Sequence, residues 1–191
     1  MYKFQFKPKF KDLKASGEDN KLAISSSTEE VSVEIVENRI SKVEHKDLGN
    51  GNTIEVIEPV KSLNIGEKTH KRDVFHFLLK GSNGDNQIRL GQTVHVGEGG
   101  TWSSLPHDFE NYPEEGFEEV FFYLLSGGSK RAIQVGRGLW NDGEEVEDSW
   151  FVSDRSFSPI PMGYHPVVGE PGVQVSYIWA YLCIKEEWEK V

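Results

Sequence analysis

The segment Gly100-Thr-Trp-Ser-Ser-Leu-Pro-His107-Asp108 is followed by Glu118-Glu119-Val-Phe-Phe-Tyr123 and later by Met162-Gly-Tyr-His165-Pro-Val167. These segments place a histidine, a glutamate and a second histidine among strand-forming residues. Imidazole and carboxylate groups that converge inside a β-structure are the ligands that a divalent transition metal needs. The sequence therefore makes His107, Glu119 and His165 candidate ligands of one metal ion.

Strands and turns fill the rest of the sequence. Residues 87–184 contain closely spaced strands separated by turn signals, a pattern typical of a β-sandwich or barrel. Residues 1–70 are more polar, although Tyr2, Phe4 and Phe6 alternate with polar residues as in a half-buried strand. We therefore predict an all-β fold with two parts: an N-terminal β extension over residues 1–70, packed on a barrel over residues 71–191. A short C-terminal helix over residues 186–190 is the only helix expected.

Composition excludes several classes of function. The net charge of −10 over 191 residues argues against a nucleic-acid surface, because binding phosphates requires clustered Lys and Arg. The single cysteine, Cys183, excludes an internal disulfide framework. The sequence shows neither a signal peptide nor an apolar run as long as a membrane span, so we expect no membrane contact and a cytoplasmic protein.

Alternation along the strand after Glu118 determines which side chains share a face. Glu119, Phe121 and Tyr123 lie on one face, and Val120, Phe122 and Leu124 lie on the other. A carboxylate buried beside aromatic residues is costly unless it is paired or binds a metal. The pattern alone leaves open that Glu119 lies in solvent at the end of the strand, or that it pairs with an arginine.

Each histidine also has an ordinary structural explanation. His165 lies in a rigid turn, Pro161-Met-Gly-Tyr-His165-Pro, where a histidine often only hydrogen-bonds a backbone carbonyl. His95, in the preceding strand, could approach the same cavity or be a hydrogen-bonded core residue. The others, His45, His70 and His76, fit no zinc signature and are expected to be structural or exposed.

The aromatic series Tyr177, Trp179 and Tyr181 alternates with smaller apolar residues. One face of this strand would present rings, an indole N–H and phenol groups to a polar ligand. The same pattern also suits a plain sandwich core, in which aromatic residues supply apolar area.

These motifs together resemble the cupin isomerases of sugar-acid and inositol breakdown, the 5-deoxy-glucuronate isomerase and 5-dehydro-4-deoxy-glucuronate (ketol) isomerase family. The resemblance extends over residues 72–184 and implies a jelly-roll cupin barrel. It further implies a divalent metal, usually zinc, with iron or manganese as alternatives. In that family three histidines and a glutamate hold the metal, and the carry-over places three of these four ligands on His107, Glu119 and His165. The first histidine of the family's His-x-His pair is missing, because Leu105-Pro106 precedes His107 directly.

The resemblance implies an aldose–ketose isomerase that acts on a small sugar acid. The metal would polarise the carbonyl while a carboxylate moves the proton, with Asp108 as the candidate base. Arg137, or else Arg131, would bind the substrate carboxylate. Two alternatives remain: a non-haem iron dioxygenase, because two histidines and one carboxylate also suit iron, and a non-catalytic sugar-binding cupin. We expect a homodimer or higher homo-oligomer that covers open sheet edges.

Overall fold

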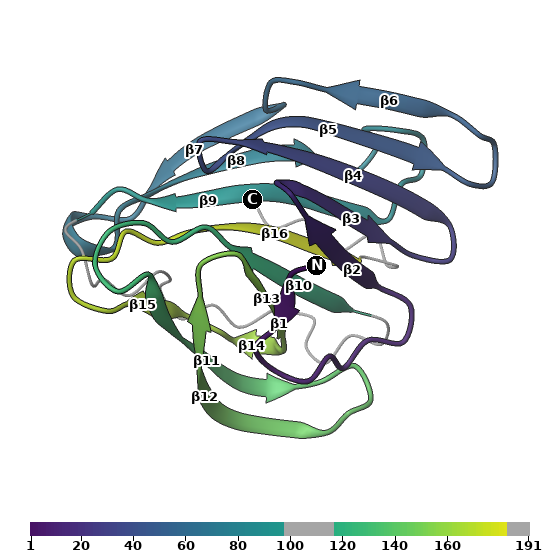
Figure 1. The fold of residues 1–191 in the computed structure, drawn as a ribbon. Coiled ribbons are helices and arrows are strands. Elements are labelled where there is room, and N and C mark those ends of the chain that lie inside the picture. Colours follow the sequence, from purple (N-terminus) through teal and green to yellow (C-terminus); the bar gives the residue numbers. More distant parts are fainter. Residues whose placement is uncertain (98–116, 183–191) are drawn as a thin grey trace.

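A computed structural model describes residues 1–97 and 117–182, which form three β-sheets (Figure 1). The central sheet has, in spatial order, β1 (Lys3–Phe4), β13 (Ser156–Ile160), β10 (Glu118–Tyr123), β16 (Ser176–Leu182), β9 (Ile88–His95), β8 (Arg72–Leu78) and β7 (Lys61–Ile65). The N-terminal sheet has the order β2 (Lys14–Glu18), β3 (Lys21–Ser25), β4 (Glu29–Val36), β5 (Arg39–Asp47) and β6 (Thr53–Val56). The small sheet contains β12 (Glu145–Ser153), β11 (Arg131–Leu139), β14 (Met162–Tyr164) and β15 (Val167–Gly169), the last two both paired with β11.

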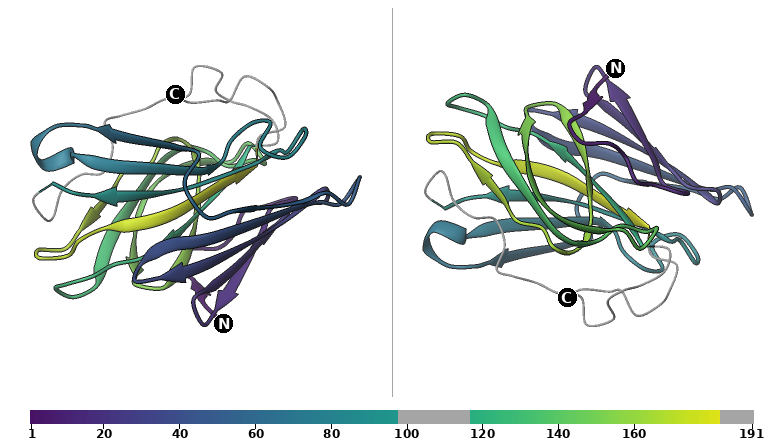
Figure 2. Two further views of the ribbon diagram at one scale, coloured as in Figure 1. Left: turned by 90° about the horizontal axis from the view of Figure 1, so that it is seen from above. Right: turned by 90° about the horizontal axis from the view of Figure 1, so that it is seen from below.

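The central sheet lies between the other two (Figures 1 and 2). Every residue of β9 and β10 is buried, as expected for strands that are covered on both faces. One face packs against the N-terminal sheet in a core that includes Leu90, Val120 and Phe122. The other face packs against the small sheet in a second core that includes Phe121 and Trp179. We call the space between the central and small sheets the barrel interior.

The all-β prediction is confirmed, and the central and small sheets form the cupin jelly-roll barrel. The described residues contain one short 3₁₀-helix, η1 (Lys68–His70), and no helix among them is long and apolar enough to cross a membrane. The expected helix at residues 186–190 and Cys183 lie outside the described residues. Strands β2–β6 form extra N-terminal strands, whereas β1 and β7 pair with the central sheet. The exact division at residue 70 therefore stays a prediction.

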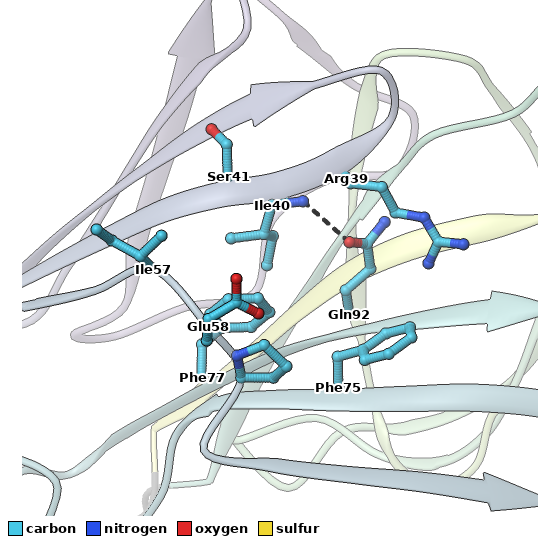
Figure 3. Close-up of a pocket in the computed structure, with 9 residues that line it drawn as sticks. Arg39, Ile40, Ser41, Ile57, Glu58, Phe75, Phe77 and Gln92 are labelled. Atoms are coloured by element: carbon cyan, nitrogen blue, oxygen red, sulfur yellow. Dashed lines mark hydrogen bonds between the residues drawn. The ribbon is translucent and has the colours of Figure 1, made fainter.

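A pocket of about 340 Å³ lies between the N-terminal and central sheets (Figure 3). Its walls include Arg39 from β5, Phe75 and Phe77 from β8, and Gln92 from β9. The Arg39 guanidinium lies 5.3 Å from the Phe75 ring centroid, and Gln92 Oε1 accepts a hydrogen bond from the Ile40 N–H at 3.0 Å. The pocket is thus on the face of the central sheet that is turned away from the barrel interior.

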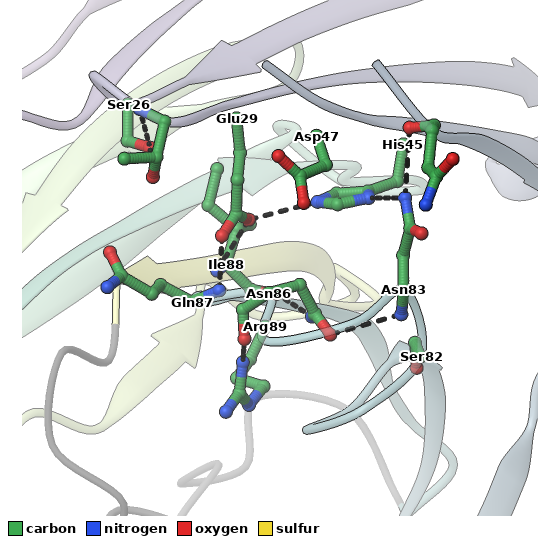
Figure 4. Close-up of polar contacts among 12 residues, drawn as sticks. Ser26, Glu29, His45, Asp47, Ser82, Asn83, Asn86, Gln87, Ile88 and Arg89 are labelled. Atoms are coloured by element: carbon green, nitrogen blue, oxygen red, sulfur yellow. Dashed lines mark hydrogen bonds and ion pairs between the residues drawn. The ribbon is translucent and has the colours of Figure 1, made fainter. Parts of the chain in front are cut away.

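A buried polar network joins the N-terminal sheet to the start of β9 (Figure 4). The Glu29 carboxylate accepts hydrogen bonds from the backbone N–H groups of Gln87 and Ile88, the latter at 2.9 Å. It also lies 3.0 Å from His45 Nε2, while Asn83 Nδ2 lies 2.9 Å from His45 Nδ1. His45 is completely buried, so its expected structural role agrees with its position. Buried polar groups of this kind are tolerated because each has partners.

Candidate metal centre in the barrel interior

The structure brings Glu119 and His165 together from distant parts of the chain. Glu119 lies near the start of β10 on the face shared with Phe121, and His165 lies in the turn between β14 and β15. Their side chains are nearly buried, with 7% and 5% of the residues' surface exposed. Glu119 Oε2 lies 3.8 Å from His165 Nε2. Glu119 is therefore not a solvent-exposed residue at the strand end, which was one of the alternatives left open by the sequence.

The tautomer of His165 directs a lone pair toward Glu119. His165 Nδ1 lies 2.8 Å from the carbonyl oxygen of Gly163, so this nitrogen carries the proton and donates a hydrogen bond to the carbonyl. In the neutral ring Nε2 is then the unprotonated nitrogen, and it faces a carboxylate oxygen. Their separation of 3.8 Å is too long for a hydrogen bond but suits two ligands of one cation, each about 2.0–2.2 Å from it. The two residues fit a shared divalent metal.

Gln134 supports the turn that carries His165. This residue is fully buried on β11, and its Nε2 donates hydrogen bonds to the carbonyl oxygens of His165 at 2.8 Å and Pro166 at 3.1 Å. Its Oε1 accepts a hydrogen bond from the Tyr123 hydroxyl at 2.7 Å. Burial raises the pKa of Tyr123 well above its usual value, so the hydroxyl stays protonated and remains a donor. The chain of contacts fixes the backbone of the histidine turn.

Gly163 gives the same turn its shape. Its φ of 109° is in the region that side chains rarely adopt, and a Cβ there would lie 2.7 Å from the carbonyl oxygen of Arg137. The glycine thus lets β14 approach β11 closely, and its own carbonyl binds His165 Nδ1.

Aromatic rings line the barrel interior beside the pair. Tyr177, Trp179 and Tyr181 share the inner face of β16, as the alternation predicted. Phe121 stacks on Tyr177 with 4.3 Å between ring centroids, and it meets the His165 ring edge-on with 5.9 Å between ring centroids. Trp179 and Tyr181 stack at 5.8 Å. These rings provide both an apolar core and a flat wall near Glu119.

Two of the predicted site residues, His107 and Asp108, lie outside the described residues. Within residues 1–97 and 117–182, no third His, Cys, Asp or Glu joins Glu119 and His165 in a metal-binding group. His107 as the third ligand and Asp108 as the base therefore stay predictions.

The placement of Arg137 does not support the role predicted for it. Arg137 is exposed on β11, where the buried positions Ala132, Gln134 and Gly136 face inward and the odd-numbered positions face outward. Arg131, the second choice, is also exposed, and it stacks on Phe151 and pairs with Glu170. Strand alternation turns both guanidinium groups away from the barrel interior.

His95 faces the barrel interior but lies far from Glu119 along the sheet. The register pairs Arg89 with Tyr181 and Tyr181 with Glu119, so His95 is six residues, or roughly 20 Å, further along β9. Burial lowers the pKa of His95 to about 4, with a smaller contribution from the positive charge of Arg72. His95 is a neutral core residue at the other end of the barrel, in agreement with its structural alternative.

Arg89 is a charged residue of the barrel interior that the sequence motifs did not indicate. It lies on β9 with 3% of its surface exposed and belongs to the same row of the sheet as Tyr181 and Glu119. Its only signal in the sequence is that it is a lone charge in the strand-like run of residues 87–96.

Comparison with known proteins gives consistent matches. A sequence model described as the KduI/IolB family matches residues 15–190, so the match includes most of the N-terminal strands. The chain is 33% identical over 116 residues to 5-deoxy-glucuronate isomerase of Bacillus subtilis (strain 168), covering 59% of this chain and 41% of that protein. The isomerase of the same name from Bacillus licheniformis is 33% identical over 118 residues, covering 60% and 41%. The chain thus spans about two fifths of the length of these relatives.

A solved structure supports the fold. The crystal structure of an IolB-like protein from Salmonella typhimurium LT2 superimposes with a TM-score of 0.59 and 15% sequence identity. The superposition covers 93% of this chain and 73% of the other. At this identity the similarity establishes the architecture.

Proposed function

Because this chain belongs to the KduI/IolB family, we propose that it is a metal-dependent aldose–ketose isomerase of a small sugar acid resembling 5-deoxy-glucuronate. The proposed metal is zinc, held by His107, Glu119 and His165. The pathway served would be sugar-acid or inositol breakdown in the cytoplasm. The single most important support is the approach of His165 Nε2 to Glu119 Oε2 at 3.8 Å inside an aromatic-lined interior.

A metal at this position would act as a Lewis acid that polarises the carbonyl of the sugar acid. The protein supplies the remaining requirements. The Gly163 carbonyl keeps the proton on Nδ1 of His165, so Nε2 keeps its lone pair. Rings such as Trp179 and Tyr181 exclude water and offer a face for the carbon chain. Asp108 remains the proposed base that moves the proton between neighbouring carbons.

Metal analysis of purified protein tests this function. Wild type should contain one equivalent of metal, and Glu119→Gln and His165→Ala should each lose most of it, because three protein ligands leave no reserve. His70→Ala is the matched control and should keep its metal, because His70 lies in η1, just before the end of β8 that pairs with His95 and not with the row of Glu119. Isomerisation of 5-deoxy-glucuronate should fall in parallel with metal content. Equal metal in wild type and in the two ligand variants would refute the assignment.

The donor set also supports a second candidate, a non-haem iron oxidoreductase, since two histidines and a carboxylate are the usual ligands of such iron. Stoichiometric iron with oxygen consumption on a candidate substrate would favour this activity. A non-catalytic sugar-binding cupin would show no stoichiometric metal and no change in melting temperature when metal or chelator is added.

We also propose a homodimer or higher homo-oligomer. Strands β6 and β12 each pair with only one neighbour among the described strands, and open edges of this kind favour subunit pairing. Light scattering coupled to size-exclusion chromatography measures the mass directly. A monomer at micromolar concentration would contradict the proposal.

A further inference from the structure

Arg89 projects into the barrel interior. At alternate positions of the same strand, a Cβ on Gly91 would lie 2.2 Å from the Trp179 ring, and Thr93 Oγ1 accepts a hydrogen bond from Trp179 Nε1 at 3.2 Å. Side chains two residues apart share a face, so Arg89 points to the same interior. Figure 4 shows its side chain on the opposite side of the chain from Glu29.

The guanidinium of Arg89 has no anionic partner in the described part of the chain. Its Nη1 donates a hydrogen bond to the backbone carbonyl of Asn86. Among residues 1–97 and 117–182, the buried Nε has no hydrogen-bond partner, and no aspartate or glutamate forms an ion pair with the group. Burial of a charge is costly unless an opposite charge compensates it. The open edge of the guanidinium, Nε with Nη2, is the edge that binds a carboxylate side-on.

Arg89 and Glu119 lie in one row across three strands. The Cα register pairs Arg89 with Tyr181 and Tyr181 with Glu119, which places the Cα atoms of Arg89 and Glu119 roughly 10 Å apart. Both side chains extend from the inner face, and Tyr181 lies between them. A six-carbon sugar acid bound at the Glu119–His165 pair could therefore extend along the Tyr181 ring toward the guanidinium.

We propose that Arg89 binds the carboxylate of the sugar acid and thereby selects acids over neutral sugars. The identity of the substrate as a sugar acid rests on the proposed function, whereas the need for an anion rests on the buried charge itself. Arg89 takes the role for which the sequence suggested Arg137. The carboxylate end of the substrate would lie at Arg89, and the reacting carbonyl would lie at the Glu119–His165 pair.

Isothermal titration calorimetry with D-glucuronate tests this inference, with D-glucose as the neutral control ligand. Arg89→Gln should weaken glucuronate binding by about 10- to 100-fold, the value of a charge-assisted hydrogen bond. Arg89→Lys keeps the charge but loses the planar guanidinium. It should bind glucuronate about 10-fold more weakly than wild type does, and more tightly than Arg89→Gln does. Arg137→Gln and Arg39→Gln, both at exposed positions, are matched controls and should bind glucuronate like wild type.

The melting temperature without ligand separates a binding role from a structural one. Arg89→Gln removes a buried charge that has no anionic partner among the described residues, so it should melt at or above the wild-type temperature, and glucuronate should no longer raise that temperature. If the glutamine variant does not fold, the Arg89→Lys titration decides the question. Wild-type affinity in a folded Arg89 variant, loss of binding in Arg137→Gln, or no saturable binding to wild type would each overturn the inference.

The failure of the proposed function would look different. Glucuronate binding that depends on Arg89, in a protein without metal or isomerase activity, would refute the isomerase and leave the anion site standing. In the His165→Ala background, Arg89→Gln should still weaken glucuronate binding by about 10-fold or more, because the two ends of the ligand are held separately.

Discussion

Glu118 and Glu119 are adjacent in the sequence and serve opposite faces of β10. The Glu118 carboxylate accepts hydrogen bonds from the backbone N–H groups of Asp12 at 3.1 Å and Leu13 at 2.6 Å, and from Asn141 Nδ2. The Glu119 carboxylate faces His165 in the barrel interior. One strand position therefore fastens the N-terminal segment to the barrel, and the next contributes to the candidate metal centre.

This division predicts different results for the two glutamates. Glu118→Ala should lower the free energy of unfolding by about 2–4 kcal/mol, because it leaves buried backbone donors without an acceptor. Its metal content per folded molecule should stay at the wild-type level. Glu119→Ala should lose metal and change the stability of the metal-free protein by less than Glu118→Ala does. Urea denaturation with chelator present, together with metal analysis, measures both quantities, and reversed effects would contradict the assignment.

Replacement of Gln134 should affect the metal site without touching it. Gln134→Leu removes the donor to the His165 and Pro166 carbonyls and the acceptor of the Tyr123 hydroxyl, so we expect about 2–3 kcal/mol of destabilisation. Metal affinity should fall by about 10- to 100-fold, as is usual when an outer residue that orients a ligand is lost. Tyr123→Phe serves as the comparison, since it removes only the outer hydrogen bond. Competition titration with a chromophoric chelator measures the affinity, and an unchanged value in Gln134→Leu would show that the turn holds its shape without the amide.

Gly163→Ala should distort the histidine turn. The expected loss is about 1–3 kcal/mol from the strained φ, together with the 2.7 Å contact to the Arg137 carbonyl oxygen. Gly143→Ala is a matched control: it also has a positive φ, of 81°, but its Cβ would have nothing within 4 Å. The control should lose about 1 kcal/mol and keep its metal affinity. Equal behaviour of the two alanine variants would mean that the close contact of β14 with β11 has no consequence for His165.

The lowered pKa of His95 should make the stability of the protein depend on pH. The folded protein holds the pKa of His95 at about 4, below the value of about 6.5 expected in the unfolded chain. The unfolded state therefore binds the proton first, so this group lowers stability as the pH falls from about 7 toward 4. The contribution should reach about 2 kcal/mol between pH 8 and pH 5. Urea unfolding at both pH values, in wild type and His95→Asn, measures it. A variant with the same pH dependence as wild type would exclude this origin.

Much of the barrel could be predicted from the sequence, because alternation determines faces. The period-two patterns of residues 118–123 and 176–182 correctly grouped Phe121 with Glu119 and the aromatic rings with one another. The outward orientation of Arg137 could not be predicted from the sequence, because β11 carries apolar residues on both faces. Ile133 and Val135 lie on the outer side, so polarity did not identify the inner one.

The role of Arg89 could not be predicted from its own strand for a related reason. A strand covered on both faces has no polar side to contrast with an apolar one, and β9 is buried throughout. Only the pairing of distant strands, which no local pattern contains, places Arg89 in the row of Glu119.

The central sheet has a consequence for any attempt to shorten this protein. Deleting strands β2–β6 to obtain a minimal barrel would expose Leu90, Val120 and Phe122 and leave an extended apolar surface in contact with water. Such a truncated protein should aggregate on expression even though every residue of the Glu119–His165 pair is retained. The N-terminal sheet is thus part of the hydrophobic core, and an engineered version of the barrel has to retain it.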